Sequence, residues 1–212
     1  MTVVLLVSGS TRSASTNTAA LRTVAALAPE GIETAWYHGL ADLPAFDPDD
    51  DGTAHPSVVA LHEQISRADA VLFCTPEYAG TLPGSFKNLL DWTVGTADLY
   101  EKPAAFLNIA APGRGDGAVA TLTTVLGYVG AAIDSEACAQ LPVARDSVGP
   151  DGLVDSAEFR AGALKALRGL ALRAATSEAV RCSVDDEEGA AGVAALLGAQ
   201  ECDRWRDFAD ET

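Results

Sequence analysis

The chain has 212 residues, of which 48% are hydrophobic, enough to bury the core of one sizeable domain. Its formal net charge of −16 and isoelectric point near 4.3 disfavour nucleic acid and anionic membrane surfaces as partners, because both would repel it at long range. No apolar run approaches the roughly 20 residues that span a bilayer, and no basic-then-apolar leader opens the sequence. We therefore expect a cytoplasmic protein.

Apolar runs and alternations predict five strands. Strand-like segments lie at residues 3–7, 32–37, 70–74 and 104–111, and the segment at 70–74 is a continuous apolar run of the kind found in strands buried on both faces. The run at 70–74 is the most uniformly apolar, and we expect it at the centre of the sheet. Alternation at Ile133, Ser135 and Ala137 predicts an edge strand.

Five segments with apolar residues at helical spacing lie between and after these strands. Their faces are marked by Leu21 and Val24, by Val58, Leu61 and Ile65, by Phe86 and Leu89, by Leu122 and Leu126, and by Phe159, Leu167 and Leu170. Strands that alternate with helices predict an α/β fold, a doubly wound five-stranded parallel sheet with helices on both faces.

The loop at residues 8–17 joins the first strand to the first helix. Side-chain hydroxyls dominate it, and Arg12 is its only charge. A helix N-terminus after such a loop presents unpaired N–H groups and the positive end of a helix dipole, which suits a phosphate. The loop lacks the Gly-Lys-Ser/Thr ending of a hydrolytic P-loop, so the phosphate would be held rather than transferred. An ordinary turn that binds nothing is the alternative, because Ser and Thr are common turn and capping residues.

Three loops should meet above the sheet, since the carboxyl ends of parallel strands share one edge. They are residues 8–17, 76–84 and 112–117. The first has a single glycine and no Gly-x-Gly-x-x-Gly fingerprint, so a mononucleotide site fits better than a dinucleotide site.

Cysteine and histidine spacing gives no sign of a metal centre or a redox pair. The four cysteines are too far apart for a CxxC pair, and we interpret Cys74 and Cys138 as buried free thiols. His38, His55 and His62 are scattered without ligand-like spacing, so no metal site is expected.

From residue 181 onward the chain changes character, with an acidic run at 185–188 and an Ala- and Gly-rich run after it. We expect one domain over residues 1–180 and an acidic, solvated C-terminal tail over 181–212. A short docked helix is the second interpretation of the tail.

The first two loops together resemble the NADPH-dependent FMN reductase family of flavodoxin-like proteins. The first matches the pattern Gly-Ser-x-Arg-x-x-Ser-x-Asn from Gly9 to Asn17. The second, residues 76–92, is close to Pro-Glu-Tyr-x-x-x-x-Pro-Gly-x-Leu-Lys-Asn-x-x-Asp-Trp. The similarity covers residues 3–175. It departs at Phe86, where the family usually has Leu, and in the third loop, which carries Pro112 and Arg114 among its glycines.

The resemblance implies a flavodoxin-like oxidoreductase that passes electrons from NADPH or NADH through bound FMN to a small acceptor such as a quinone or free flavin. The first loop would hold the phosphate, and the second would lie along the flavin ring mostly through backbone groups. The implied cofactor contacts are Ser10, Arg12, Ser15, Thr16 and Asn17 in the first loop, Pro76, Glu77, Tyr78, Ala79 and Gly80 in the second, and Gly113 in the third. No catalytic side chain is expected, because the flavin carries the reaction.

Two other functions stay open. One is a flavodoxin-like electron carrier that holds FMN, lacks a nicotinamide site and serves a basic protein partner suited to its acidic surface. The other is a family member that has lost the flavin and acts only through assembly.

The helix expected at residues 84–95 bears on assembly. It carries Phe86, Leu89, Leu90 and Trp92, more apolar surface than one sheet face needs. We therefore expect a homodimer or homotetramer with the flavin near the interface. For Asn88, on the same helix, a structural or interface role is favoured over flavin contact.

Overall fold

The computed structural model describes residues 1–12 and 14–187, with side chains placed as far as residue 177. The chain divides into two compact units, Met1–Ala175 and Thr176–Thr212, and the first unit contains the whole sheet. The last helix runs through the expected domain boundary at 180 and ends at Glu187. The rest of the expected tail, residues 188–212, lies outside the described residues, so the domain division stays a prediction.

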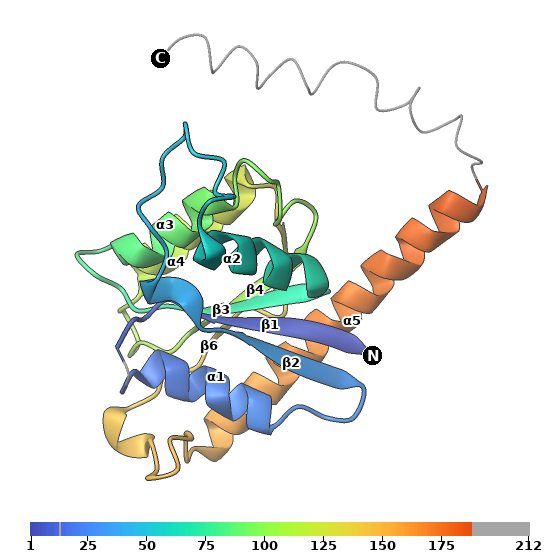
Figure 1. Cartoon of the computed structure of the whole chain (residues 1–212). Helices are drawn as coiled ribbons and strands as arrows, with labels where there is room; N and C mark the ends of the chain where they lie inside the picture. Colours follow the sequence, from blue (N-terminus) through green and yellow to red (C-terminus); the bar gives the residue numbers. More distant parts are fainter. Residues whose placement is uncertain (13, 188–212) are drawn as a thin grey trace. The chain divides into compact units, whose positions relative to one another are not determined.

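A single parallel sheet forms the centre of the first unit (Figure 1). Its strands are β1 (Thr2–Ser8), β2 (Ile32–Tyr37), β3 (Ala70–Cys74), β4 (Pro103–Asn108), β5 (Ala132–Ile133) and β6 (Ala139–Gln140). They follow the order β2-β1-β3-β4-β5, and β6 also pairs with β4. This is the flavodoxin-like order, in which the direction of winding reverses between β1 and β3.

Helices cover both faces of the sheet, as the sequence predicts (Figure 1). They are α1 (Thr16–Ala26), α2 (Pro56–Arg67), α3 (Gly84–Trp92), α4 (Asp116–Tyr128) and α5 (Ala157–Glu187), with short 3-10 turns η1 (Gly39–Ala41) and η2 (Arg145–Ser147). Side chains of α1 and α5 pack on one face, and those of α2, α3 and α4 pack on the other. The doubly wound arrangement is therefore confirmed.

Strand β3 explains why its sequence is apolar throughout. All five residues are buried, and their side chains alternate between the two cores. Leu72 lies in the core with α1 and α5, and Phe73 lies in the other core. There its ring meets the ring of Phe86 edge-on, with centroids 5.8 Å apart. Both faces of β3 are covered, so a polar side chain at any of its positions would be buried. The strand lies in the middle of the sheet order, and the expected central place of this run is confirmed.

The last two expected strands differ from the sequence prediction. The fourth ends at Asn108 rather than 111, because Asn108 Oδ1 accepts the N–H of Ala110 at 3.0 Å and turns the chain. The expected edge strand at 133–137 is present at the edge of the sheet but is shorter than predicted, since β5 ends at Ile133. Asp134 Oδ1 accepts the N–H of Glu136 at 3.0 Å, and this turn separates β5 from β6. Both short pieces pair with β4, so one expected strand becomes two.

The apolar residues of α3 are buried within their own chain. Phe86, Leu89, Leu90 and Trp92 are all at most 3% exposed. The argument for an oligomer from this helix is therefore wrong, because no surplus apolar face is left. The oligomeric state itself stays a prediction.

The chain that follows η1 lies along α3 and covers Trp92. Trp92 Nε1 donates to the carbonyl oxygen of Pro44 at 3.0 Å, and Asn88 Nδ2 donates to the same oxygen at 2.8 Å. Asn88 Oδ1 also accepts the N–H of Phe46 at 2.8 Å. Asn88 thus has the structural role that the sequence favoured. No helix among the described residues has the length and apolar character of a bilayer span.

Candidate functional site

A cleft of about 430 Å³ opens at the carboxyl ends of β3 and β4, beside the N-terminus of α1; we call it the central cleft. It is lined by Thr16, Asn17, Thr75, Pro76, Glu77, Asn108, Ile109, Ala110, Ala111, Arg114, Gly115, Val143 and Arg145. All three predicted loops contribute, joined by the segment that follows β6. Its position above the β1/β3 reversal is where doubly wound sheets bind ligands.

The first loop leaves the start of α1 open to a ligand. Ser15 is the N-cap residue and is extended, and its side chain makes no capping bond. The first helical bond runs from the N–H of Ala19 to the Ser15 carbonyl oxygen, at 2.9 Å. Among the described residues, the N–H groups of residues 16–18 therefore have no hydrogen-bond acceptor, the usual condition of a first helical turn. Such a turn is suited to an anion.

Asn17 ties α1 to the end of β3. Its side chain is only 6% exposed, and the Cys74 thiol donates to Asn17 Oδ1 at 3.2 Å. Burial raises the pKa of the Cys74 thiol, so it stays protonated and can donate this bond. Cys74 therefore acts here as a buried structural thiol, as predicted.

The second loop is a tight hairpin. Tyr78 and Thr81 exchange two backbone hydrogen bonds, of 2.9 and 3.1 Å. Between them Ala79 has φ 51° and Gly80 has φ 78°, the left-handed pair of a type I′ turn. Tyr78 is 56% exposed, so its ring lies on the surface of the described structure rather than in a core.

The carboxylate of Glu77 caps helix α4. Glu77 Oε2 accepts the N–H of Gly117 at 2.8 Å and that of Ala118 at 3.2 Å. A side-chain Cβ at Gly117 would overlap the carbonyl oxygen of Gly80, so the second loop presses directly on the start of α4. Glu77 therefore offers a ligand its backbone rather than its carboxylate.

The third loop is folded around Asn108. Gly115, the N-cap of α4, has φ 82°, and a Cβ there would come within 2.5 Å of Asn108 Oδ1. Asn108 Nδ2 donates to the carbonyl oxygen of Arg114 at 3.4 Å. Gly113, predicted as a cofactor contact, is exposed with φ 75° and does not line the central cleft.

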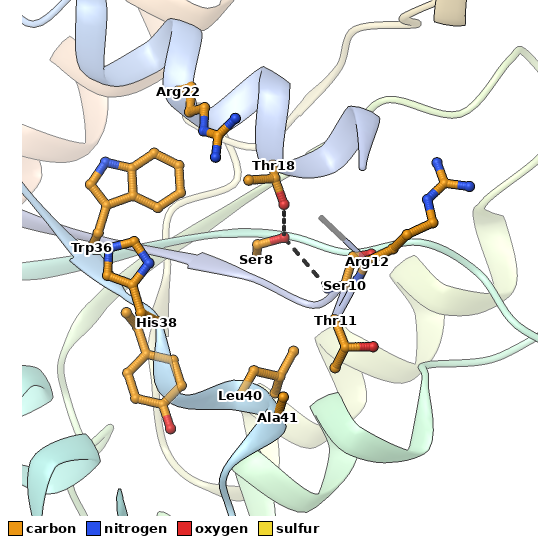
Figure 2. A pocket seen from close by; sticks show the side chains of 11 residues that line it. Ser8, Ser10, Thr11, Arg12, Thr18, Arg22, Trp36, His38, Leu40 and Ala41 are labelled. Atoms are coloured by element: carbon orange, nitrogen blue, oxygen red, sulfur yellow. Dashed lines mark hydrogen bonds between the residues drawn. The ribbon is translucent and has the colours of Figure 1, made fainter. Parts of the chain in front are cut away.

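A second cavity, of about 420 Å³, lies on the other side of the first loop, at the carboxyl end of β2 (Figure 2). We call it the β2 cavity. It is lined by Ser8, Ser10, Thr11, Arg12, Thr18, Arg22, Trp36, Tyr37, His38, Leu40 and Ala41. It shares no lining residue with the central cleft.

The predicted contacts are thus divided between cavities. Thr16, Asn17, Pro76 and Glu77 line the central cleft, whereas Ser10 and Arg12 line the β2 cavity. Ser15 lines a third cavity, between α1 and η2. Tyr78, Ala79 and Gly80 form the hairpin beside the central cleft and line none of the three.

Four arginines surround the start of α1. Arg114 and Arg145 line the central cleft, Arg12 and Arg22 line the β2 cavity, and Arg22 and Arg145 both line the third cavity. Within the described part of the chain, none of the four forms an ion pair. In a chain of net charge −16, unpaired cations gathered at one sheet edge create a local positive potential that attracts anions.

The sequence analysis missed Asn108, Arg22 and Arg145 as site residues. Asn108 ends a strand that points at the predicted edge, and this was the available signal. Arg145 follows β6 in a short turn, and nothing in the local pattern around it predicts a return to the cleft.

Fold and cleft together define a flavodoxin-like α/β protein whose site can accept a planar ligand bearing a phosphate. A model of the NADPH-dependent FMN reductase family matches residues 1–142. The chain belongs to this family, and the resemblance seen in its first two loops is confirmed.

Sequence comparisons with individual proteins point to the same family. The Escherichia coli quinone reductase is 41% identical over 86 residues, 40% of this chain and 46% of that protein. The NAD(P)H-dependent FMN reductase of Pseudomonas aeruginosa is 41% identical over 113 residues, 51% of this chain and 60% of that protein. The matches thus span about half the length of these curated relatives.

A solved structure extends the similarity over most of the first unit. The flavoenzyme NAD(P)H:(acceptor) oxidoreductase FerB of Paracoccus denitrificans superposes with a TM-score of 0.70 and 28% sequence identity. The superposition covers 80% of this chain and 97% of FerB.

Proposed function

We propose that this protein is an FMN-dependent oxidoreductase that passes electrons from NADPH or NADH through bound FMN to a small acceptor such as a quinone or free flavin. The observation that carries the proposal is the central cleft, where the open first turn of α1 meets the hairpin of the second loop. Its volume of about 430 Å³ lies within the range of small-molecule sites. The names of the relatives point to the same class of reaction.

The residues of the first loop fit a phosphate. The free N–H groups at the start of α1 would bind its oxygens, with hydroxyl groups of Ser10, Ser15 and Thr16 beside them. Asn17 is held in place by Cys74 and would add its amide. Arg12 now donates to the carbonyl oxygen of Ala14 at 2.9 Å, and it is exposed, so it can turn to a phosphate without desolvation.

The second loop fits the edge of a planar ring. Pro76 and Glu77 bring their backbone into the cleft, and the Ala79-Gly80 turn closes the hairpin beside it. Gly113, on the third loop, completes the proposed set of ring contacts. Arg114 and Arg145 would offset the charge of an anionic ligand in the cleft.

Bound FMN would supply hydride acceptance and electron transfer. The part of the protein is to bind, orient and tune this group, and backbone N–H groups near the ring would stabilise negative charge that develops on it. We assign no side chain as a catalytic acid or base.

Assembly and location belong to the same proposal. We propose a homodimer or homotetramer, supported by the exposed side chains of Tyr100 and Tyr128, which are 60% and 74% exposed. The segments that carry them are joined, because the N–H of Glu101 donates to the carbonyl oxygen of Gly130 at 2.8 Å. Light scattering at micromolar concentration tests this, and a monomer would refute it. A cytoplasmic location is supported by the free thiol of Cys74, since thiols persist in reducing compartments.

The test of the activity is the absorption spectrum of the purified full-length protein and its rate of NAD(P)H oxidation, with and without added FMN and a quinone. We expect flavin absorbance and parallel double-reciprocal plots, because donor and acceptor would use the same face of the ring in turn. An electron carrier would bind FMN and give negligible NAD(P)H oxidation, and that result would refute the reductase proposal. Family membership disfavours the carrier.

A further inference from the structure

The β2 cavity has an aromatic wall on one side. Trp36 lies near the end of β2, and His38 follows just beyond the strand, at the N-cap of η1. Both side chains line the β2 cavity. Their rings are nearly parallel, with an interplanar angle of 14° and centroids 5.9 Å apart (Figure 2). β2 is the edge strand and pairs only with β1 among the described strands. His38 is exposed and Trp36 is half-buried against the core beneath it, so the parallel pair forms a partly open platform on which another planar ring can stack.

Cations and hydroxyl groups lie across from this wall. Arg22 extends from α1 toward the cavity, beside the hydrogen bond of 2.9 Å that Ser8 and Thr18 share (Figure 2). No hydrogen bond or ion pair engages Arg22 within the described part of the chain. Arg12 stands at the far rim, with its guanidinium turned away from the aromatic pair (Figure 2). An unpaired guanidinium opposite an aromatic platform can bind a phosphate in two parallel hydrogen bonds.

We propose that the β2 cavity binds the adenosine phosphate part of a nucleotide, with the base on Trp36 and His38 and the phosphate at Arg22. The cavity volume of about 420 Å³ is suited to a mononucleotide. The flavin ring would lie in the central cleft, which shares no lining residue with the β2 cavity. Ser10 and Arg12 line the β2 cavity but are kept for the FMN phosphate, so the phosphate of the nucleotide is assigned to Arg22. The nucleotide is either a free adenosine phosphate or the adenosine 2′-phosphate end of NADPH, and only the second source rests on the proposed function.

Calorimetric titration of the FMN-loaded full chain tests the site. The probes are 2′-AMP, 5′-AMP and adenosine, and the variants are Arg22→Ala, His38→Ala and the control Arg67→Ala, which breaks an exposed pair with Glu63 on α2. We expect Arg22→Ala to weaken the binding of 2′-AMP or 5′-AMP about tenfold or more and to leave the binding of adenosine unchanged. His38→Ala should weaken all three probes, and Arg67→Ala none. Both target side chains are exposed, so the variants should fold normally.

Two results would overturn the proposal: no binding of either AMP to the FMN-loaded chain, or equal binding of the AMPs by the Arg22 and Arg67 variants. Steady-state kinetics of Arg22→Ala then separate the two sources. A raised KM for NADPH with an unchanged KM for NADH supports the dinucleotide end. Unchanged KM values for both donors with AMP binding lost support a free nucleotide. Because calorimetry needs no turnover, a protein that oxidises no NAD(P)H would refute the proposed function without touching the AMP result.

Discussion

Glu77 and Gly117 are 40 residues apart, and the hydrogen bond between them joins the second loop to the first turn of α4. Glu77 Oε2 accepts the N–H of Gly117 at 2.8 Å and also the N–H of the next residue, Ala118, at 3.2 Å. The carboxylate sits at the positive end of the α4 dipole, where a negative charge is stabilising. One side chain thus couples the hairpin of the second loop to the helix that follows the third loop.

Removing this carboxylate should cost stability and weaken FMN binding. We expect Glu77→Ala to lower the free energy of unfolding by about 1–2 kcal/mol, because two first-turn amides lose their acceptor. Urea unfolding and FMN titration measure the two effects. The control is Glu63→Ala, which breaks an exposed pair with Arg67 and should cost less than about 1 kcal/mol. Equal stability of the two variants would show that Glu77 does not act as a cap.

Helix α4 offers a matched pair of glycine substitutions. Gly117→Ala should destabilise the fold and open the cleft, because the added methyl group would overlap the carbonyl oxygen of Gly80. Gly127→Ala, on the same helix, meets nothing within 4 Å and should raise the free energy of unfolding by about 0.5–1 kcal/mol through helix propensity. Thermal unfolding measures both. A Gly117→Ala variant as stable as the natural chain would mean that the second loop can move away from α4.

Ala79 holds a backbone conformation that costs energy for a side chain. Its φ of 51° is left-handed, which is unfavourable by about 1–2 kcal/mol for most L-residues. Ala79→Asn or Ala79→Gly should therefore raise the melting temperature, since Asn and Gly are the preferred residues of type I′ turns. The control Ala120→Gly, at an exposed position within α4, should lower it. If neither Ala79 variant raised the melting temperature, the type I′ turn at Ala79 and Gly80 would be contradicted.

Arg12 tests the phosphate end of the proposed FMN site. Arg12→Ala should weaken the binding of FMN by about 1.5–3 kcal/mol, the contribution of a charge-assisted hydrogen bond, and should weaken the binding of riboflavin much less. Fluorescence titration of the apoprotein with both ligands gives the ratio. An equal loss for FMN and riboflavin would place the guanidinium away from the phosphate.

Tyr37 has a buried hydroxyl group without a hydrogen-bond partner among the described residues. Burial, with a smaller contribution from the charge of Asp42, raises the pKa of Tyr37, so the group stays neutral throughout the working range of pH. Tyr37→Phe should leave stability unchanged or raise it by about 1 kcal/mol, because the unpaired hydroxyl is already a cost. Tyr128→Phe, at a position 74% exposed, is the neutral control in urea unfolding. A clear loss of stability in Tyr37→Phe would reveal a hydrogen bond to this hydroxyl.

Local pattern was enough to predict most of the fold. The faces marked by Val58, Leu61 and Ile65 and by Leu122 and Leu126 are buried as expected, because helical period and apolar character decide which side of a helix meets a sheet. The prediction failed where one side chain redirected the chain. The Asp134 turn breaks the alternation that had indicated a single edge strand, and alternation alone does not reveal such a turn.

Family membership and the fold class followed from the sequence alone, because the two loop motifs and the alternation of strands and helices are local features of the chain. Tertiary structure alone decided what individual side chains do. It gave the Glu77 carboxylate the role of a cap for α4, covered Trp92 with the carbonyl oxygen of Pro44, and brought Arg22 and Trp36 to the same cavity. The physical reason is the same in each case: these contacts join residues far apart in the chain, and packing of whole elements, not local periodicity, sets which of them meet.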